Sequence, residues 1–173
     1  MKEAFKQHLA QDLLAFRLPA YQEIPDMGLY LEQVTQYICE QLSPLQENAI
    51  TSSMISNYVK KGLVANPVKK RYYRDQIVYL MFIALAKNVL SLDNLILFIQ
   101  LQQRTYPIEK AYEYFCKELQ NALDYVSGLK EKMDSVGVDN NDVKFLFRDT
   151  IVAIAHKIYL DKCFSAMAEE KEG

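Results

Sequence analysis

The segment from Thr51 to Ile77 constrains the fold of this chain most, because its local signals follow one another closely. Thr51 or Ser52 can cap a helix by accepting a backbone N–H bond in the first turn. Gly62 stands where this helix should end, at a position that tolerates a left-handed backbone. Asn66-Pro67 then predicts a turn.

The same segment continues with an extended piece and a second helix. Lys69 to Tyr73 is short, basic and aromatic, and its tyrosines favour a strand. From Asp75 a helix is expected, with an apolar face made of Ile77, Leu80, Met81, Ala84 and Leu85. The predicted order is therefore a short helix, a tight turn, a basic hairpin or wing, and a longer helix.

The charge of this segment differs from that of the rest of the chain. It holds six basic side chains and one acidic side chain, a net charge of +5. The remaining residues hold 14 basic and 21 acidic side chains, a net charge of −7, so the chain as a whole is at −2. A concentrated basic site on an acidic protein favours contact with nucleic-acid phosphates. The alternative is a solvated charged loop.

Candidate DNA contacts are the polar, basic and tyrosine side chains of this segment: Ser52, Ser53, Asn57, Tyr58, Lys60, Lys61, Lys69, Lys70, Arg71, Tyr73 and Arg74. An asparagine can bond adenine through both of its polar atoms, although capping and simple exposure explain Ser52, Ser53 and Asn57 equally well. The ring of Tyr58 is expected in the core, with its hydroxyl available to a phosphate. Tyr72 and Tyr73 alternate faces in a strand, so only one should reach solvent.

The segment resembles the DNA-binding head of the MerR family. That family has a recognition helix ending in Tyr-Tyr-Glu-x-x-Gly-Leu, then a wing, then Tyr-Ser-x-x-Asp-Leu, and this chain has Asn57-Tyr58-Val59-Lys60-Lys61-Gly62-Leu63 and Tyr72-Tyr73-Arg74-Asp75-Gln76-Ile77. The family's Ser-Leu-Glu-Glu-Ile is matched by Ser91-Leu92-Asp93-Asn94-Leu95. Ser56 replaces the arginine before the tyrosine pair, and Asn57 replaces the first tyrosine.

A closer resemblance, from about Leu18 to Ile99, is to the bacterial family named domain of unknown function 1836, which is expected to be MerR-like. The residues that carry it are Leu18-Pro19, Ile24-Pro25, Leu29-Tyr30-Leu31, Gln33-Val34, Ile50 to Gly62 and Tyr72 to Ile77. The resemblance implies a winged helix-turn-helix fold and a DNA-binding class, without an established activity.

Helical periodicity covers most of the remaining chain. Helices are expected over residues 2–16, 27 or 28–42, 75–88, 92–101, 108–133 and 142–168, with a loop at 43–50 and a fraying tail at 169–173. Ser91 should cap one helix, Gly128 can weaken or end another, and Gly137 with Asp139-Asn140-Asn141 should form a turn and a cap.

The fold class expected is mostly α, in three parts. Residues 1–26 form an N-terminal helix and linker, residues 27–104 a MerR-like winged helix-turn-helix head, and residues 105–173 a helical region for dimerisation or effector binding. The last helix is apolar on most sides, so it either lies at the centre of a bundle or pairs with its copy. The MerR resemblance implies a homodimer.

No pattern in the chain indicates catalysis, a cofactor or a metal. Cys39, Cys116 and Cys163 are far apart, and neither His8 nor His156 has a cysteine or carboxylate at a ligand spacing. The N-terminus lacks the character of a signal peptide, and no apolar run is long enough to span a membrane. We therefore expect a non-enzymatic cytoplasmic protein with reduced thiols.

The sequence leaves three functional hypotheses open. The first is a transcriptional regulator that binds duplex DNA as a homodimer. The alternative is a non-catalytic protein–protein interaction module built on a winged-helix head, whose lysines meet an acidic partner. The third is a small-molecule sensor whose tyrosine-rich C-terminal half binds an effector, although these tyrosines also suit ordinary packing: Tyr106, Tyr112, Tyr114, Tyr125 and Tyr159.

Overall fold

The computed structural model describes the backbone of residues 3–137 and 140–172 and the side chains of residues 6–137 and 140–169. Over these residues the chain is mostly helical, which confirms the predicted fold class at this level. The elements are α1 (Glu3–Ala15), the short 3-10 helix η1 (Tyr21–Glu23), β1 (Leu29–Tyr30), α2 (Leu31–Leu42), α3 (Ser52–Lys60), β2 (Arg71–Tyr72), α4 (Arg74–Ala86), α5 (Leu92–Thr105), α6 (Ile108–Val126) and α7 (Asp142–Glu172).

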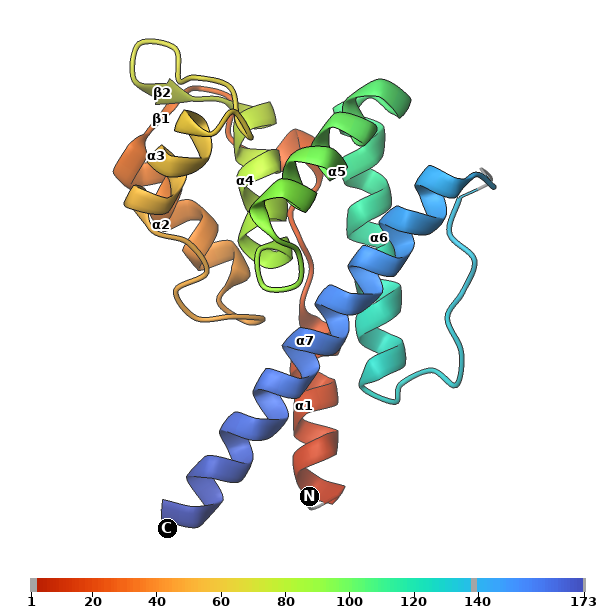
Figure 1. The fold of residues 1–173 in the computed structure, drawn as a ribbon. Coiled ribbons are helices and arrows are strands. Elements are labelled where there is room, and N and C mark those ends of the chain that lie inside the picture. Colours follow the sequence, from red (N-terminus) through yellow and green to blue (C-terminus); the bar gives the residue numbers. More distant parts are fainter. Residues whose placement is uncertain (1–2, 138–139, 173) are drawn as a thin grey trace.

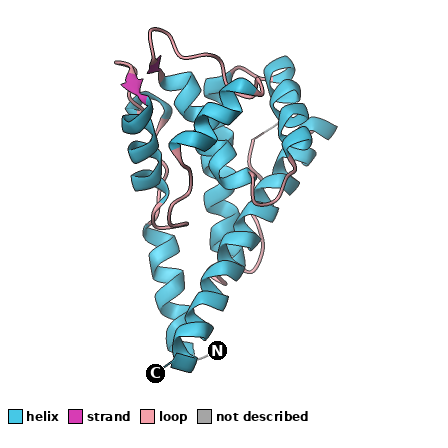
Figure 2. Ribbon diagram, turned by 60° about the vertical axis from the view of Figure 1, so that its left-hand side comes forward, coloured by secondary structure: helices cyan, strands magenta, loops and turns pink. Residues whose placement is uncertain are grey.

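The molecule is elongated, and its two ends differ in structure. At one end α2, α3 and the two strands gather beside α4, while α5, α6 and α7 lie on the other side of α4 (Figure 1). At the opposite end α1 and the C-terminal part of α7 project together, as the view turned by 60° also shows (Figure 2). The strands are therefore far from both chain ends.

Helix α4 occupies the centre of the fold. Between Gln76 and Ala86 every side chain except that of Tyr79 is buried, as expected for a helix that is apolar on all sides. The Phe82 ring stacks on Phe98 of α5 at a centroid distance of 4.7 Å and meets Phe115 of α6 edge-on at 5.4 Å. Buried side chains from α1 to α7 form one continuous cluster around this helix.

The two strands form an antiparallel ribbon that leads into two helices. Leu29 pairs with Tyr72, and Tyr30 pairs with Arg71. The Tyr30 N–H donates to Gln33 Oε1 at 2.9 Å, where β1 enters α2, and the Tyr73 N–H donates to Gln76 Oε1 at 2.7 Å, where β2 enters α4. The helix predicted from residue 27 or 28 therefore starts only at Leu31, because strand pairing keeps the preceding backbone extended.

Three other predicted helix ends are wrong, and part of one predicted helix cap lies outside the described residues. Helix α6 stops at Val126 rather than 133, since Gly128 adopts a φ of +82° two residues later. Helix α5 runs on to Thr105 rather than 101, and α7 runs on to Glu172 rather than 168. Asn141 caps α7 by accepting from the Lys144 N–H at 2.9 Å, whereas Asp139 lies outside the described residues.

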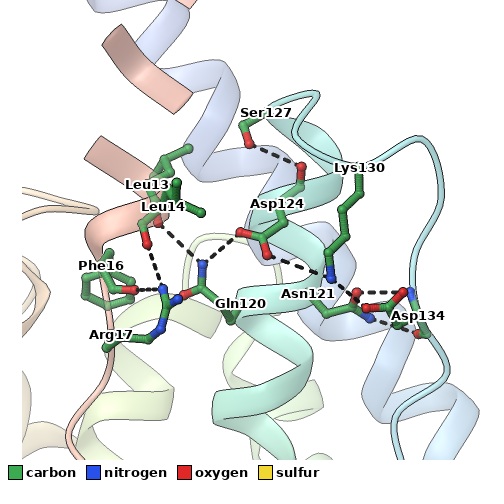
Figure 3. Close-up of polar contacts among 10 residues, drawn as sticks. All are labelled: Leu13, Leu14, Phe16, Arg17, Gln120, Asn121, Asp124, Ser127, Lys130 and Asp134. Carbon is green, nitrogen blue, oxygen red and sulfur yellow. Dashed lines mark hydrogen bonds and ion pairs between the residues drawn. The ribbon is translucent and has the colours of Figure 1, made fainter. Parts of the chain in front are cut away.

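A polar network joins the C-terminal end of α6 to α1 and to the loop after α6 (Figure 3). Gln120 donates to Asp124 at 2.9 Å and to the Leu13 carbonyl at 3.4 Å. Asn121, only 5% exposed, exchanges two bonds with the backbone of Asp134, at 2.9 and 3.0 Å. The loop after α6 is thus held against the helix although it has no regular structure.

None of the helices within the described residues combines the length and the apolar character that a membrane crossing requires.

Candidate nucleic-acid interface

Helix α3 exposes a polar face beside the β1–β2 ribbon (Figure 1). Thr51 caps it, because its hydroxyl accepts from the Met54 N–H at 3.2 Å. Ile55 is fully buried, whereas Ser53 and Asn57 are exposed. The Ser52 hydroxyl is half-buried and lies 2.9 Å from the Thr35 hydroxyl of α2. Ser52 therefore joins the two helices, while Ser53 and Asn57 face solvent.

Tyr58 has its ring in the core, as predicted, and only 7% of the residue is exposed. Burial raises the pKa of Tyr58, so its hydroxyl stays protonated at neutral pH. The same cause raises the pKa of Tyr72 in β2. Of the adjacent tyrosines, Tyr72 is buried and Tyr73 half-buried, in line with alternating faces.

The end of α3 brings two lysines to the surface. The Leu63 N–H donates to the Tyr58 carbonyl and the Gly62 N–H to the Val59 carbonyl, each at 3.0 Å, around a Gly62 φ of +78°. This pair of bonds is the Schellman motif that glycine favours. Lys60 and Lys61, just before the glycine, are exposed, and their positive charge suits a helix C-terminus as well as a phosphate.

The chain reverses at Lys69 and Lys70, not at the predicted Asn66-Pro67. Val68 and Arg71 exchange both backbone hydrogen bonds at 3.0 Å, and the two lysines between them have φ values of +49° and +64°. Positive φ at both central positions defines a type I′ turn, which Asn-Gly usually fills. The strand predicted over 69–73 is accordingly only Arg71–Tyr72, and the exposed hairpin tip (Lys69 and Lys70) presents both ammonium groups to solvent.

Arg71 is held in place by the opposite strand. Its guanidinium donates to the Tyr30 hydroxyl at 2.9 Å, and its central carbon lies 4.7 Å from the centroid of the Tyr30 ring. Gly28, with a φ of +86°, allows this close packing, because a Cβ there would lie 2.9 Å from the Arg71 Cδ. The guanidinium is therefore oriented before any ligand arrives.

Arg74 has protein partners on the linker between α1 and β1. Its Nε donates to the Ile24 carbonyl at 3.0 Å, an Nη donates to the Gln22 carbonyl at 3.2 Å, and another Nη lies 3.9 Å from Asp26. Its guanidinium also lies 5.3 Å from the Tyr21 ring centroid. These contacts give Arg74 a structural role that its place in a basic sequence does not reveal.

The sequence analysis did not identify two residues of this region. Tyr30 orients Arg71 from 41 positions away, and local sequence carries no signal of that pairing. Lys87 at the C-terminal end of α4 is half-buried beside α3, with its Nζ 3.9 Å from Met54 Sδ, and burial lowers its pKa. The apolar periodicity of the sequence predicts that α4 lies in the core, but it does not show which end of α4 packs against α3.

Among the described residues, no group of three or more His, Cys, Asp or Glu side chains lies close enough together to hold a metal ion. The chemistry on this surface is that of exposed ammonium groups, one oriented guanidinium, and small polar side chains on a helix. Such groups bind anions and hydrogen-bonding surfaces.

Comparison with known proteins places the chain in a family. No curated protein and no solved structure matched the chain. The family described as Domain of unknown function (DUF1836) matches residues 19–115, from the linker after α1 into α6. The match extends past the resemblance read from the sequence, which ended near Ile99, and it covers more than half of the 173 residues. The protein therefore belongs to the DUF1836 family.

Proposed function

We propose that this protein is a non-catalytic, MerR-like regulator of transcription that binds duplex DNA through α3 and the hairpin tip (Lys69 and Lys70) that precedes β2. The observation that carries the proposal is the set of exposed lysines Lys60, Lys61, Lys69 and Lys70, on an otherwise acidic chain. The order α2, α3, hairpin, α4 is that of a winged helix-turn-helix, and it supports the same function.

In this proposal α3 enters the major groove and the hairpin follows the phosphate backbone. Ser53 and Asn57 face solvent on α3, so their side chains can reach base edges. Lys60, Lys61 and the hairpin tip contact phosphates, which supplies affinity without sequence information. Arg71 adds an oriented guanidinium, whereas Arg74 is committed to the linker.

We further propose that two copies pair through α7, so that two heads read a pseudo-palindromic site. Leu146, Leu160 and Met167 are 45–48% exposed and stand multiples of seven residues apart, and Phe164 beside them is 66% exposed. Apolar side chains repeated every seven residues form the seam of paired helices. A two-fold axis would bury this α7 stripe (Leu146, Leu160, Phe164 and Met167) against itself.

The pairing is tested by measuring molar mass in solution by light scattering across protein concentrations. The intact chain should have twice the monomer mass, and a Leu160→Glu/Phe164→Glu variant should be monomeric, with unchanged helical content by circular dichroism. A matched Glu131→Leu variant, in the loop after α6, should remain dimeric. A dimer that survives in the α7 variant would refute this interface.

The DNA function is tested by binding to a random-sequence duplex over a series of salt concentrations. Replacing Lys60, Lys61, Lys69 and Lys70 with Ala should weaken binding and reduce the slope of log K against log salt by about 3 to 4. A control with Lys6, Lys117, Lys132 and Lys162 replaced by Ala loses the same net charge elsewhere, and should keep most of the slope. Equal losses in both variants would contradict a local interface.

A second candidate function is a protein-binding module whose lysines meet an acidic partner. Two observations favour it: Ser56 and Asn57 replace residues of the MerR pattern, and residues 43–51 separate α2 from α3, a connection longer than the usual helix-turn-helix turn of about 3 to 4 residues. Absence of duplex binding at low salt, with retained binding to an acidic protein, would select this function. Either role suits the cytoplasm, where the thiols of Cys39, Cys116 and Cys163 stay reduced.

A further inference from the structure

The first two turns of α3 expose only small polar side chains to full solvent. Ser53, Ser56 and Asn57 are exposed, and their spacing of three and four residues places them side by side on one face of the helix. The opposite face is closed by Ile55 and Tyr58, which are buried in the core. When a recognition helix enters the major groove, its N-terminal residues contact the base edges. These three side chains therefore hold the positions that meet bases in the proposed complex.

Two of the three side chains have no competing hydrogen bond. The side chains of Ser56 and Asn57 bond to no other residue that the structure describes, whereas the Ser53 hydroxyl lies 3.2 Å from the Thr51 hydroxyl at the helix cap. Ser56 stands where the MerR pattern has an arginine, and Asn57 where it has a tyrosine. The departure from that pattern thus leaves two small polar groups in the middle of the exposed face, both available to a partner.

The side chains that commonly recognise guanine are placed elsewhere. Arginine and lysine do so by donating to the N7 and O6 atoms of the base. Helix α3 has no arginine or lysine before Lys60 in its last turn. The guanidinium of Arg71 is bonded to Tyr30, and that of Arg74 is bonded to carbonyls of the linker. The base-facing part of α3 is therefore without a guanine-recognising side chain.

The amide of an asparagine complements adenine better than guanine. It offers one donor and one acceptor, and adenine presents one acceptor (N7) and one donor (the N6 amino group) in the major groove, so both hydrogen bonds form. Guanine presents two acceptors, N7 and O6, so the amide oxygen finds no donor there. A serine hydroxyl can donate or accept and suits either base. The exposed face of α3 therefore favours an A·T pair over a G·C pair.

We propose that α3 recognises an adenine in the major groove through the side chain of Asn57, while the Ser56 hydroxyl bonds the adjacent base pair. This inference rests on the proposed DNA-binding function and adds a base preference to it. Lys60, Lys61 and the hairpin tip contact phosphates, which supplies affinity for any duplex. Asn57 decides which sequence is bound most tightly.

The base preference is measured by selecting bound duplexes from a pool with a randomised central segment and sequencing them. The intact chain should enrich an adenine at one fixed position of the selected motif. Asn57→Arg should change this position to guanine, because a guanidinium donates to both N7 and O6, and Asn57→Ala should remove the preference at this position alone. Asn94→Ala, at an exposed asparagine of α5, is the matched control and should leave the motif unchanged. A motif that is identical for the intact chain and Asn57→Ala would overturn the proposal.

Direct contact is tested with the selected duplex in which 7-deazaadenine replaces the adenine. This base still pairs with thymine but lacks the N7 acceptor. Binding by the intact chain should weaken about three- to tenfold, as expected for one lost hydrogen bond, whereas Asn57→Ala should bind both duplexes equally. Equal binding of both duplexes by the intact chain would refute the contact.

This inference and the DNA-binding function fail in different ways. Absence of binding to any duplex at low salt refutes the DNA-binding function and this inference with it. Salt-dependent binding without a preference that depends on Asn57 leaves the DNA-binding function standing and refutes only the recognition of adenine by α3.

Discussion

Val68 and Arg71 exchange both of their backbone hydrogen bonds across the two lysines of the hairpin tip, at 3.0 Å each. Each lysine between them adopts a left-handed backbone, which costs a residue with a side chain roughly 1–2 kcal/mol relative to right-handed conformations. Asparagine and glycine fill such turns at lower cost. The two lysines therefore place positive charge at the hairpin tip at a cost in local stability.

Replacing the hairpin tip with Lys69→Asn/Lys70→Gly should therefore stabilise the protein while weakening DNA binding. We expect the free energy of unfolding in urea to rise by about 1 kcal/mol, because the strain at both positions is relieved. The slope of log K against log salt for duplex binding should fall by about 2, because two lysines are removed. Lys132→Asn, at an exposed lysine in the loop after α6, should change neither quantity, and a stability loss in the double variant would contradict the turn assignment.

Arg74→Ala should act on stability, because the guanidinium joins α4 to the linker through the carbonyls of Ile24 and Gln22. The loss of these charge-assisted bonds should lower the free energy of unfolding by about 1–3 kcal/mol. Arg74→Lys should recover little of it, since an ammonium cannot make the same forked contacts. Lys70→Ala provides the comparison, with at most a small change expected. Urea unfolding followed by circular dichroism distinguishes these outcomes, and a fully stable Arg74→Ala variant would exclude the structural role.

Asn121→Leu should loosen the loop after α6. The substitution keeps the number and branching of the side-chain heavy atoms but leaves the backbone N–H and carbonyl of Asp134 without their partners. Because Asp134 is exposed and water can replace part of this bonding, we expect a loss of about 1–2 kcal/mol in the free energy of unfolding. Limited proteolysis should cut residues 127–136 faster than in the wild type. Asn88→Ala, at an exposed asparagine that bonds Gln46, should leave the cleavage rate unchanged.

Glu118 should make stability depend on pH. Burial raises the pKa of Glu118 above its usual range, and the Arg148 charge only partly opposes this effect. The folded state thus holds the proton more tightly than the unfolded chain. The resulting stability is fully present below the usual pKa of about 4.3 and is lost as pH rises through the higher folded value.

Glu118→Gln cannot titrate, so the free energy of unfolding of this variant minus that of the wild type should grow as pH rises from about 4 towards neutrality. The measurement is urea unfolding at a series of pH values. Glu131→Gln, at an exposed glutamate, corrects for the general loss of a carboxylate. A pH-independent difference for Glu118→Gln would show that the folded and unfolded states share one pKa at this position.

Several local features were predictable because their physical cause lies within a few residues. Thr51 and Ser91 cap helices as expected, each accepting a backbone N–H three residues ahead at 3.2 Å. Gly62 ends α3 in the left-handed conformation that its position suggested. The prediction of a helix over 108–133 was wrong at its C-terminal end, because Gly128 is compatible with either continuation or termination of a helix. In the structure the helix ends there: the Gly128 N–H donates to the Tyr125 carbonyl and the Leu129 N–H to the Asp124 carbonyl.

The sequence by itself determined the mostly helical class, the helix caps and the basic character of residues 51–77, since propensity, capping and charge are properties of neighbouring residues. The tertiary structure alone decided the pairing of Leu29 with Tyr72, the hydrogen bonding of Arg74 to the linker, and the burial of Glu118 against Arg148. These contacts join residues from 30 to 50 positions apart, and each depends on how the helices around α4 pack. Short-range patterns carry no information about that packing, because many partners satisfy the same local preference.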